Sequence, residues 1–369
     1  MAKLLLLFVI CVGLLPVAVQ AQENTEFIPG EVWEDTDGNP INAHGGGLLY
    51  HNGTYYWYGE YKKGKTILPD WATWECYRTD VVGVGCYSSK DLLNWKFEGI
   101  VLPAVKDDPN HDLHPSKVLE RPKVVYNKKT GKFVMWAHVE SADYSKACAG
   151  VAVSDSPVGP FVYQGSFRPN NAMSRDQTVF VDDDGTPWMS WGNGTCFLVK
   201  LKPNMTELDG NIEILKMPKF VEGPWIHKRG NLYYLTYASM GKGRETISYA
   251  TAPSMDGPWT YRGVLTGMAE NSFTIHPGII EFKGQNYLFY HNAILTIDSK
   301  SGATGRRSVC IDYLYYLPDG RMAYVEQTKE GITVKPKTAA EVAEIVNPYT
   351  DEEEVVVEIV QNDTESRKN

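Results

Sequence analysis

Three carboxylic acids, Glu120, Asp176 and Glu222, stand at equivalent points of a repeated sequence pattern. Together they supply the groups that hydrolysis of a glycosidic bond needs. One carboxylic acid protonates the leaving oxygen, and a second group directs a water molecule or acts as the nucleophile. Glu222 is the best candidate for the acid, because the adjacent Gly223-Pro224-Trp225 would partly remove its carboxyl group from water and keep it neutral.

The competing interpretation of each acid is a salt bridge near the centre of the fold. Arg121 follows Glu120 and Arg175 precedes Asp176, so a cation stands next to both of these acids in the sequence. A cluster of carboxylates is costly unless its members are solvated, paired or used. Chemistry is therefore the better interpretation of Glu222, and a structural role stays open for the other two.

The acids belong to a pattern that occurs five times. Phe220 to Tyr237 reads as a strand, a tight turn at Arg229-Gly230-Asn231 and a second strand rich in aromatic and β-branched residues, which is typical of a β-hairpin. Similar hairpins surround Gly53, Gly131, Gly185 and Gly284, and a further pair of strands follows each hairpin. Two hairpins repeated five times, at periods of roughly 45 to 75 residues, predict an all-β fold, a five-bladed β-propeller with four-stranded blades.

A polar residue lies at or just before the first strand of each predicted blade. These residues are His44, Glu120, Asp176, Glu222 and His276. Because the innermost strands of propeller blades surround the central channel, we expect the five side chains to converge on one funnel at the axis.

The chain begins with a predicted signal peptide over residues 1–21, in which Lys3 precedes an apolar run and small residues mark a cleavage site. The cleavage point has no cysteine for a lipid anchor, and no later apolar run approaches the ~20 residues needed to span a bilayer. We therefore expect a secreted or periplasmic protein without a membrane span. Residues 22–338 would form the propeller catalytic domain, and residues 339–369 an acidic C-terminal tail.

The composition favours a neutral or cationic ligand. A formal net charge of −9 argues against a nucleic acid partner, since phosphate binding needs a clustered basic surface. Aromatic residues make up 12% of the chain and could offer platforms for the C–H faces of sugars, although propeller cores are also aromatic for packing reasons.

Several motifs resemble glycoside hydrolase family 43. The second half resembles its arabinofuranosidase and β-xylosidase branch through Glu222-Gly-Pro-Trp, His276-Pro-Gly-Ile-Ile-Glu-Phe-Lys-Gly, Tyr287-Leu-Phe-Tyr-His-Asn292 and Arg307-Ser-Val-Cys. The first half is similar to its exo-β-1,3-galactanase branch through Asp35-Thr-Asp-Gly-Asn-Pro-Ile, Ala43-His-Gly-Gly-Gly, Tyr55-Tyr-Trp-Tyr-Gly-Glu60, Glu120-Arg-Pro-Lys-Val, Ser174-Arg-Asp176 and Asp182-Asp-Asp-Gly. The resemblance covers about residues 31 to 335.

This resemblance implies a role for each axis residue. Glu222 would be the general acid, Asp176 the carboxylate that tunes and orients it, and Glu120 an assisting or substrate-binding carboxylate. His276 matches a histidine that often helps to hold a structural calcium ion at the axis, although no cofactor would be required for hydrolysis. We expect five further residues to bind substrate: His44, Glu60, Trp225, Asn271 and Arg307.

One departure from the family pattern concerns the general base. Most members carry an aspartate base on the first blade, where this chain has Ala43-His44-Gly45. The galactanase-like branch also lacks that aspartate and is thought to use an amide from a later blade, but the corresponding segment here, residues 270–273, contains no glutamine. Glu120, His44 and Asn271 stay open as the base, with Glu120 ranked first.

The resemblance therefore implies an exported hydrolase of plant polysaccharide that acts with inversion and from the chain end, with β-1,3-galactan or arabinogalactan as the expected substrate. Within the same class, an arabinofuranosidase or β-xylosidase is the alternative. A sugar-binding propeller that has lost catalysis is the alternative from another class, motivated by the missing aspartate at position 44.

Overall fold

The computed structural model describes residues 24, 26–43, 45, 47–62, 66–67, 78–294, 307–350 and 352–361, with only the backbone at 66–67 and 78–79. The predicted signal peptide and His44 lie outside the described residues. No helix in the described ranges is long and apolar enough to cross a bilayer.

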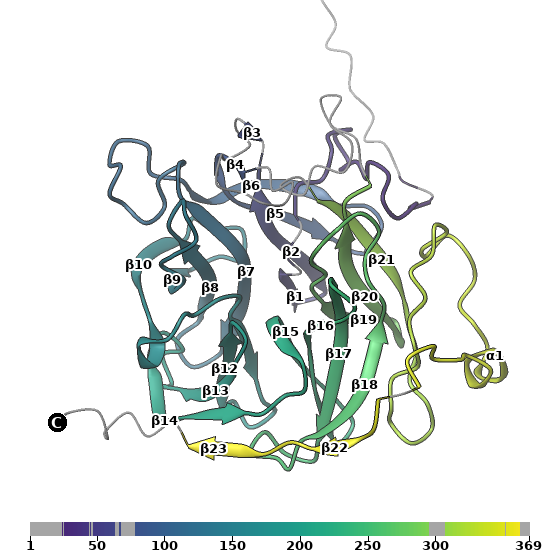
Figure 1. Cartoon of the computed structure of the whole chain (residues 1–369). Coiled ribbons are helices and arrows are strands. Elements are labelled where there is room, and N and C mark those ends of the chain that lie inside the picture. The colour runs from purple at the N-terminus through teal and green to yellow at the C-terminus, as the bar shows by residue number, and fades with distance from the viewer. Residues whose placement is uncertain are drawn as a thin grey trace, which may run out of the picture.

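Five sheets surround a central axis, which confirms the predicted five-bladed propeller (Figure 1). The first blade contains β1 (Gly47–His51), β2 (Thr54–Tyr61), β5 (Gly83–Ser89) and β6 (Lys96–Pro103). The second contains β7 (Val118–Asn127), β8 (Lys132–Glu140), β9 (Cys148–Ser154) and β10 (Val162–Phe167). The third contains β11 (Thr178–Val181), β12 (Pro187–Gly192), β13 (Cys196–Leu201) and β14 (Leu208–Leu215). The fourth contains β15 (Phe220–Arg229), β16 (Leu232–Met240), β17 (Glu245–Ala252) and β18 (Thr260–Thr266), and the fifth β19 (Gly278–Phe282), β20 (Gln285–Asn292) and β21 (Ser308–Leu314).

The blades depart from the predicted four strands in two ways. Within the described residues the fifth blade has three strands, and the third and fourth blades have five. The extra strands come from the C-terminal segment, in which β23 (Ile359–Gln361) pairs with β14 and β22 (Val355–Val356) pairs with β18. This segment follows the lower rim of the molecule in Figure 1 and covers the outer edges of two blades that would otherwise present unpaired backbone groups.

Three short elements lie outside the blades: the strand pair β3 (Thr66–Ile67) and β4 (Arg78–Thr79), the 3₁₀ turn η1 (Pro169–Asn171) and the helix α1 (Ala339–Ala343). The helix begins with a capping box, in which the Thr338 side chain accepts from the Glu341 backbone N–H and the Glu341 carboxylate accepts from Thr338.

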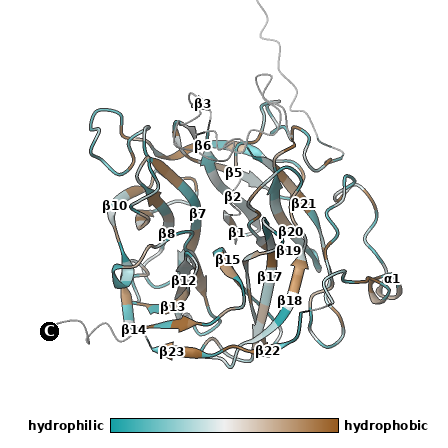
Figure 2. Cartoon of the chain, viewed as in Figure 1, coloured by the Kyte–Doolittle hydropathy of each residue, from teal (hydrophilic) through white to brown (hydrophobic). Residues whose placement is uncertain are grey.

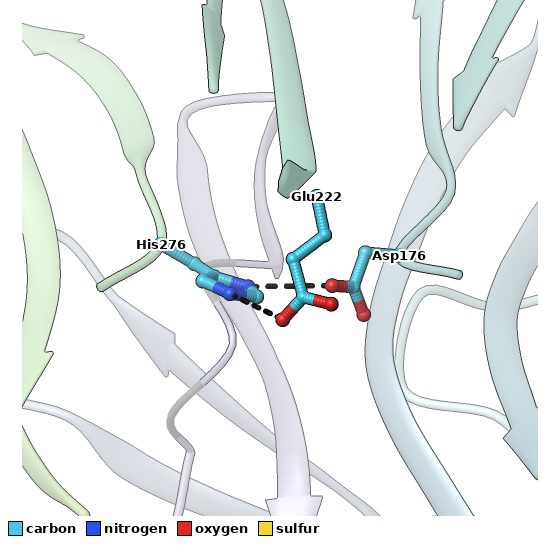
Figure 3. Close-up of side chains that lie close together, drawn as sticks. All are labelled: Asp176, Glu222 and His276. Atoms are coloured by element: carbon cyan, nitrogen blue, oxygen red, sulfur yellow. Dashed lines mark hydrogen bonds and ion pairs between the residues drawn. The ribbon is translucent and has the colours of Figure 1, made fainter. Parts of the chain in front are cut away.

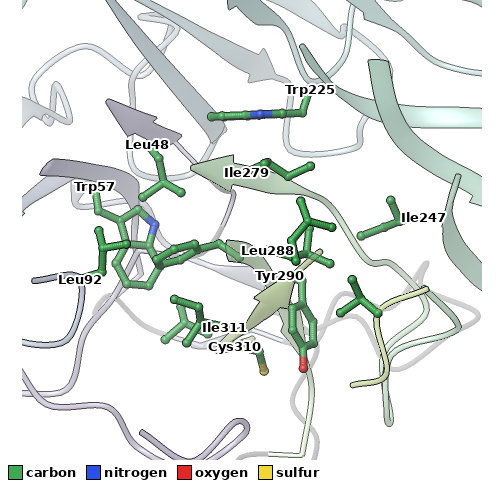
Figure 4. Packing of buried hydrophobic residues seen from close by; sticks show 14 of the residues in the cluster. Leu48, Trp57, Leu92, Trp225, Ile247, Ile279, Leu288, Tyr290, Cys310 and Ile311 are labelled. Carbon is green, nitrogen blue, oxygen red and sulfur yellow. The ribbon is translucent and has the colours of Figure 1, made fainter. Parts of the chain in front are cut away.

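Aromatic residues fill the space between blades. The largest apolar cluster joins the first, fourth and fifth blades around Trp57, Trp95 and Phe289, whose rings meet edge to face at centroid distances of 5.1 to 6.4 Å. Figure 4 shows Trp225 at the upper boundary of this cluster. Hydrophilic residues dominate the loops around the periphery (Figure 2). The packed blades therefore provide a rigid support for polar side chains at the axis.

Candidate active site

Three of the four described axis residues lie at an irregularity in the backbone. Glu120 and Glu222 are both the third residue of an inner strand, and each is followed by a residue with positive φ, Arg121 at 53° and Gly223 at 62°. The strand register shifts at both places, as it does at β-bulges, which redirect side chains. Asp176, itself at φ 54°, and His276 both lie two residues before an inner strand.

His276 joins the two candidate acids of the third and fourth blades. Its Nε2 lies 3.1 Å from Oε1 of Glu222, and its Nδ1 lies 3.6 Å from Oδ2 of Asp176. Figure 3 shows the imidazole between the two carboxyl groups, with each of the three side chains coming from a different part of the backbone. The sequence prediction that these residues meet at the axis is therefore confirmed for this trio.

Gly223 is the residue that permits this approach. A Cβ atom at Gly223 would lie 2.8 Å from Nδ1 of His276, closer than a real Cβ contact, and the positive φ is itself unfavourable for residues with side chains. The glycine after Glu222 thus serves both the bulge and the contact with the imidazole.

Glu222 has the electrostatic environment of an acid. Burial and the nearby charge of Asp176 raise the pKa of its carboxyl group to about 7, against the partly opposing effect of Arg175, whose Nη1 lies 3.7 Å from Oε2 of Glu222. Its side chain keeps 13% of its surface exposed. It is therefore a carboxyl group that stays protonated up to near-neutral pH and can still be reached.

Asp176 has the opposite character. Although burial alone would raise the pKa of its carboxyl group, His138, His276 and Arg121 hold that pKa well below its usual range. The Oδ1 atom lies 3.5 Å from Nδ1 of His138 and 3.8 Å from Nε of Arg121. Asp176 therefore remains ionised beside Glu222, and two neighbouring carboxyl groups have pKa values that are pushed apart.

Glu120 is engaged at both oxygens. Its Oε1 accepts hydrogen bonds from Nζ of Lys62 and the hydroxyl of Tyr144, both at 3.1 Å, and its Oε2 lies 3.6 Å from Nδ1 of His138. Although burial opposes ionisation, Lys62, His138 and Arg307 hold the pKa of the Glu120 carboxyl group well below its usual range. Glu120 is therefore an ionised carboxylate.

The two arginines do not pair with the acids next to them in the sequence. No described ion pair joins Arg121 to Glu120 or Arg175 to Asp176. Arg121 contacts Asp176 and lies 4.0 Å from Glu60, and Arg175 contacts Glu222. Arg121 has a positive φ, and each arginine reaches a carboxylate of another part of the site.

The residues expected to bind substrate occupy different depths. Arg307 has a buried Nη1 atom without a hydrogen-bond partner among the described residues, which leaves a donor for a ligand. Glu60 is almost fully buried, with Oε2 2.8 Å from Nζ of Lys62 and Oε1 accepting from the N–H of Arg121. Glu60 thus contacts Lys62, which pairs with Glu120, and Arg121, which pairs with Asp176.

Trp225 and Asn271 have no described contact with the carboxylates. Trp225 is 8% exposed, belongs to the apolar cluster of Figure 4 and has Nζ of Lys123 5.8 Å from its ring centroid. Asn271 is an exposed turn residue with a φ of 55°, and no described hydrogen bond or ion pair connects it to Glu222.

Sequence reasoning missed several polar residues of the site. His138 on β8 is the cross-strand partner of Glu120, and Glu245 on β17 places Oε2 3.5 Å from Nε2 of His276. Lys62 and Tyr144 come from the loops that follow the second strands of the first two blades. A search for polar residues on the strand beside each inner strand would have found His138.

One group of three described residues is close enough to hold a metal ion, with ligand atoms of Asp176, Glu222 and His276 within 4.8 Å of one another. Calcium prefers six to eight oxygen ligands, whereas this set offers two carboxylates and an imidazole. The group therefore fits proton transfer better than calcium binding.

Comparison with known sequences places these features in a family. The sequence profile of glycosyl hydrolases family 43 matches residues 48–322. The chain is 27% identical over 293 residues to the arabinoxylan arabinofuranohydrolase of Bacillus subtilis, covering 67% of this chain and 55% of the relative. It is 32% identical over 163 residues to the β-D-galactofuranosidase of Aspergillus niger, covering 42% of this chain and 47% of the relative. The chain thus spans about half the length of these curated relatives.

Solved structures give a complementary result. A family 43 β-1,3-galactosidase with galactodeoxynojirimycin superposes with a TM-score of 0.65 and 30% identity, covering 80% of this chain and 97% of that one. The exo-β-1,3-galactanase of Phanerochaete chrysosporium with β-1,3-galactotriose gives a TM-score of 0.66 and 26% identity, covering 81% and 66% of the two chains.

Proposed function

The chain belongs to glycosyl hydrolases family 43, and from this premise we propose that it is an exported, inverting hydrolase that releases sugars from the ends of plant polysaccharide chains. The observation that carries the proposal is the grouping of Glu222 and Asp176 around His276, in which the surroundings raise the pKa of Glu222 and lower that of Asp176. Two neighbouring carboxyl groups with separated pKa values are what acid-catalysed cleavage of a glycosidic bond requires.

In the proposed reaction, the carboxyl group of Glu222 gives its proton to the glycosidic oxygen while the bond from that oxygen to the anomeric carbon breaks. A water molecule attacks the opposite face of the sugar and loses a proton to the general base, which inverts the anomeric configuration. Asp176 keeps the pKa of Glu222 high, and His276 orients the Glu222 carboxyl group through Nε2, while its Nδ1 faces Asp176. Glu222 then regains a proton from solvent before the next turnover.

We propose Glu120 as the general base. It is ionised, and it lies at one end of a row in which His138, Asp176 and His276 separate it from Glu222 at the other end, with successive contacts of 3.6, 3.5, 3.6 and 3.1 Å. Inversion needs an acid and a base that act on opposite faces of the sugar, and Glu120 is an ionised carboxylate with no described contact to Glu222. Its engagement with Lys62 weakens it as a base, so His44 and Asn271 remain the alternatives.

The other predicted site residues would act on the substrate or on its neighbours. Arg307 would donate to a sugar hydroxyl through its unpartnered Nη1. Glu60 would act by holding Lys62 and the Arg121 backbone in place. Trp225 would close the floor of the site, and Asn271 would reach substrate only at the rim.

β-1,3-Galactan or arabinogalactan is the substrate that we propose first. The support is the 30% identity to a β-1,3-galactosidase of which 97% is covered. An arabinofuranosidase or β-xylosidase is the second candidate, favoured by the 293-residue match to an arabinoxylan arabinofuranohydrolase.

The experiment that separates these possibilities measures release of aglycone from aryl β-galactoside, α-arabinofuranoside and β-xyloside in parallel, together with release of galactose from β-1,3-galactan. Turnover of the galactoside and galactan supports the first proposal, and turnover of either pentoside supports the second. A sugar-binding propeller without catalysis would bind one of these sugars in calorimetry and release no aglycone, and that result would overturn the proposal of an enzyme.

No cofactor is required in this proposal, because the proton transfers use carboxyl groups of the chain. A calcium ion near His276 would be structural. Activity that survives exhaustive treatment with EDTA supports this view, and activity that disappears and returns with calcium contradicts it.

We also propose that residues 1–21 are removed on export and that residues 22–338 act as the catalytic unit, with residues 339–369 as its C-terminal tail. Mass spectrometry of the protein from the culture medium or periplasm should show a chain that begins at Gln22. An intact N-terminus on protein retained in the cytoplasm would refute export.

A further inference from the structure

A second cavity, of about 300 Å³, lies beside the fifth blade. Its walls come from the segment after β18, the end of β20, the N-terminal lead-in and residues 324–329. None of the candidate site residues described above lines it. Its volume is at the lower end of the range for small-molecule sites, which is enough for one or two sugar rings.

Asn292 provides a free donor in this cavity. The residue is 6% exposed, and its Oδ1 accepts from the N–H of Ile294 at 3.5 Å. Its Nδ2 has no hydrogen-bond acceptor within the described ranges. This amide N–H group is therefore available to donate to a ligand oxygen.

The remaining polar wall is rigidly built. Gln327 donates through Nε2 to Oγ1 of Thr266 at 3.1 Å and to the carbonyl of Gly267 at 2.8 Å, which fixes the direction of its Oε1. The hydroxyls of Tyr290 and Thr328 both donate to the buried Asp312, at 2.6 Å each. Figure 4 shows the Tyr290 hydroxyl pointing away from the apolar cluster.

The lining indicates a neutral polyhydroxylated ligand. Pro29, Met268 and Ile294 offer apolar surface, and the amides of Asn292 and Gln327 lie among them. Glu270, Glu326 and Lys329 add charges of both signs, so the cavity has no strong preference for an ion. The cluster that could hold a cation among the described residues lies elsewhere, at Asp176. Sugar rings combine apolar C–H faces with hydroxyl groups and match this mixture.

Two short stretches of chain connect the cavity to the axis site. The segment that contributes Glu270 to the cavity continues to His276 at the axis, and the Glu270 carbonyl accepts from the N–H of Ala293 at 3.0 Å. His291, next to Asn292, faces the other way and contacts Oγ1 of Thr274 at 3.1 Å. Strand β20 therefore carries one residue of the cavity, Asn292, next to one on the axis side, His291, whose ring centroid lies 5.8 Å from that of His276.

We propose that this cavity is a secondary subsite that binds a sugar residue of the same polysaccharide at a distance from the bond that is cleaved. The proposal rests on the proposed function and adds a determinant of preference for long or branched substrates. Asn292 and Gln327 hydrogen-bond to the sugar hydroxyls, and Met268 packs against the ring.

Two variants test the subsite: Met268→Trp, which fills the cavity, and Gln327→Ala, which removes a polar wall. Gln164→Ala is the matched control, because Gln164 is an exposed glutamine on β10 whose amide also donates to a backbone carbonyl. Steady-state kinetics on the polysaccharide and on the aryl monoglycoside are compared for each protein, and thermal unfolding checks that each is folded.

Both cavity variants should lower kcat/KM on the polysaccharide by about tenfold, the equivalent of ~1.4 kcal/mol. The loss should come chiefly from a higher KM. Their kinetics on the aryl monoglycoside should not change. The Gln164→Ala control should leave kcat/KM on both substrates unchanged. Unchanged kinetics on the polysaccharide in folded Met268→Trp, or equal losses on both substrates, would overturn the subsite.

Failure of the proposed function gives a different result, namely no turnover of any glycoside by the wild-type protein. In that case, calorimetry with the oligosaccharide still tests the cavity, because Met268→Trp should weaken binding of the long ligand and not of the monosaccharide. Equal affinities of wild type and Met268→Trp for the long ligand would exclude the subsite. Calorimetric titration with calcium alone should give the same heat for wild type and Gln327→Ala. A binding heat that is present in wild type and lost in Gln327→Ala would indicate a cation site instead.

Discussion

Nε2 of His276 lies 3.1 Å from Oε1 of Glu222. The other ring nitrogen faces Asp176, so one imidazole holds a carboxyl group that stays protonated and one that stays ionised. Burial and Arg121 lower the pKa of His276, which keeps its ring neutral beside the acids. A neutral imidazole carries one N–H, and it can donate to only one of the two carboxyl groups at a time.

Replacement of Glu222 by Gln should remove proton donation and keep the side-chain shape. We expect kcat on the natural glycoside to fall by ~10²–10⁴-fold, since that is the usual contribution of general acid catalysis. An aryl glycoside with a good leaving group needs little protonation and should lose much less. Equal losses on both substrates in a folded Glu222→Gln protein would remove Glu222 from the role of acid.

Replacement of Asp176 by Asn tests how the acid is tuned. The negative charge of Asp176 contributes to the raised pKa of Glu222, so its removal should lower that pKa from about 7. Since the acid must be protonated, activity is lost as the pH rises through its pKa, and the alkaline limb of the kcat profile should move to lower pH. A reduced rate with an unmoved alkaline limb would make Asp176 a purely structural residue.

Gly223→Ala should reduce activity more than stability. The new Cβ would meet Nδ1 of His276 at 2.8 Å and force the imidazole away from the carboxyl groups. The strain of a positive φ adds about 1–2 kcal/mol of destabilisation. Thermal unfolding and kcat are measured together, with Gly230→Ala as the control, because Gly230 also has positive φ but a Cβ there would meet nothing within 4 Å. An active Gly223→Ala enzyme would show that the contact with His276 is dispensable.

His138 should make stability depend on pH. Although burial opposes its protonation, Asp176, Glu120 and Glu140 hold the pKa of His138 well above its usual range. A group whose pKa is raised by folding stabilises the protein fully below its unfolded pKa of ~6.5, and this contribution is lost as the pH rises through the folded value. Denaturant unfolding of wild type and His138→Gln should therefore differ more at pH 5.5 than at pH 9. A constant difference would mean that His138 does not change protonation on folding.

The sequence was sufficient to predict the propeller and the convergence of Asp176, Glu222 and His276, because both follow from a local repeat whose glycine turns fix where each inner strand begins. It was not sufficient for the fifth strands of two blades, since β22 and β23 pair with residues far away in the chain. The partners of the acids were missed for a similar reason. The pairing of Glu120 with His138 depends on strand register across a bulge, and the contact of Arg121 with Asp176 depends on one positive φ angle.

The general base is the last role to be assigned, and chemical rescue can assign it. In an inverting hydrolase the base lies ~6.5–9.5 Å from the acid, on the other side of the sugar. Glu120 is ionised and has no described contact with Glu222, which makes it the first residue to test. Glu120→Ala should lose most of its activity, regain part of it with added azide, and release a glycosyl azide of inverted configuration.

The competing outcomes of this rescue are distinct. If azide has no effect on Glu120→Ala but restores His44→Ala, the base is His44, and Glu120 serves to bind substrate or to anchor Lys62. If Asn271→Ala alone loses activity and no azide adduct forms, an amide on the rim directs the water. Lys62→Met separates the two roles of Glu120, because loss of the ammonium should raise the pKa of Glu120 and move the acidic limb of the kcat/KM profile to higher pH. An acidic limb that does not move in Lys62→Met would show that another group takes the proton from water.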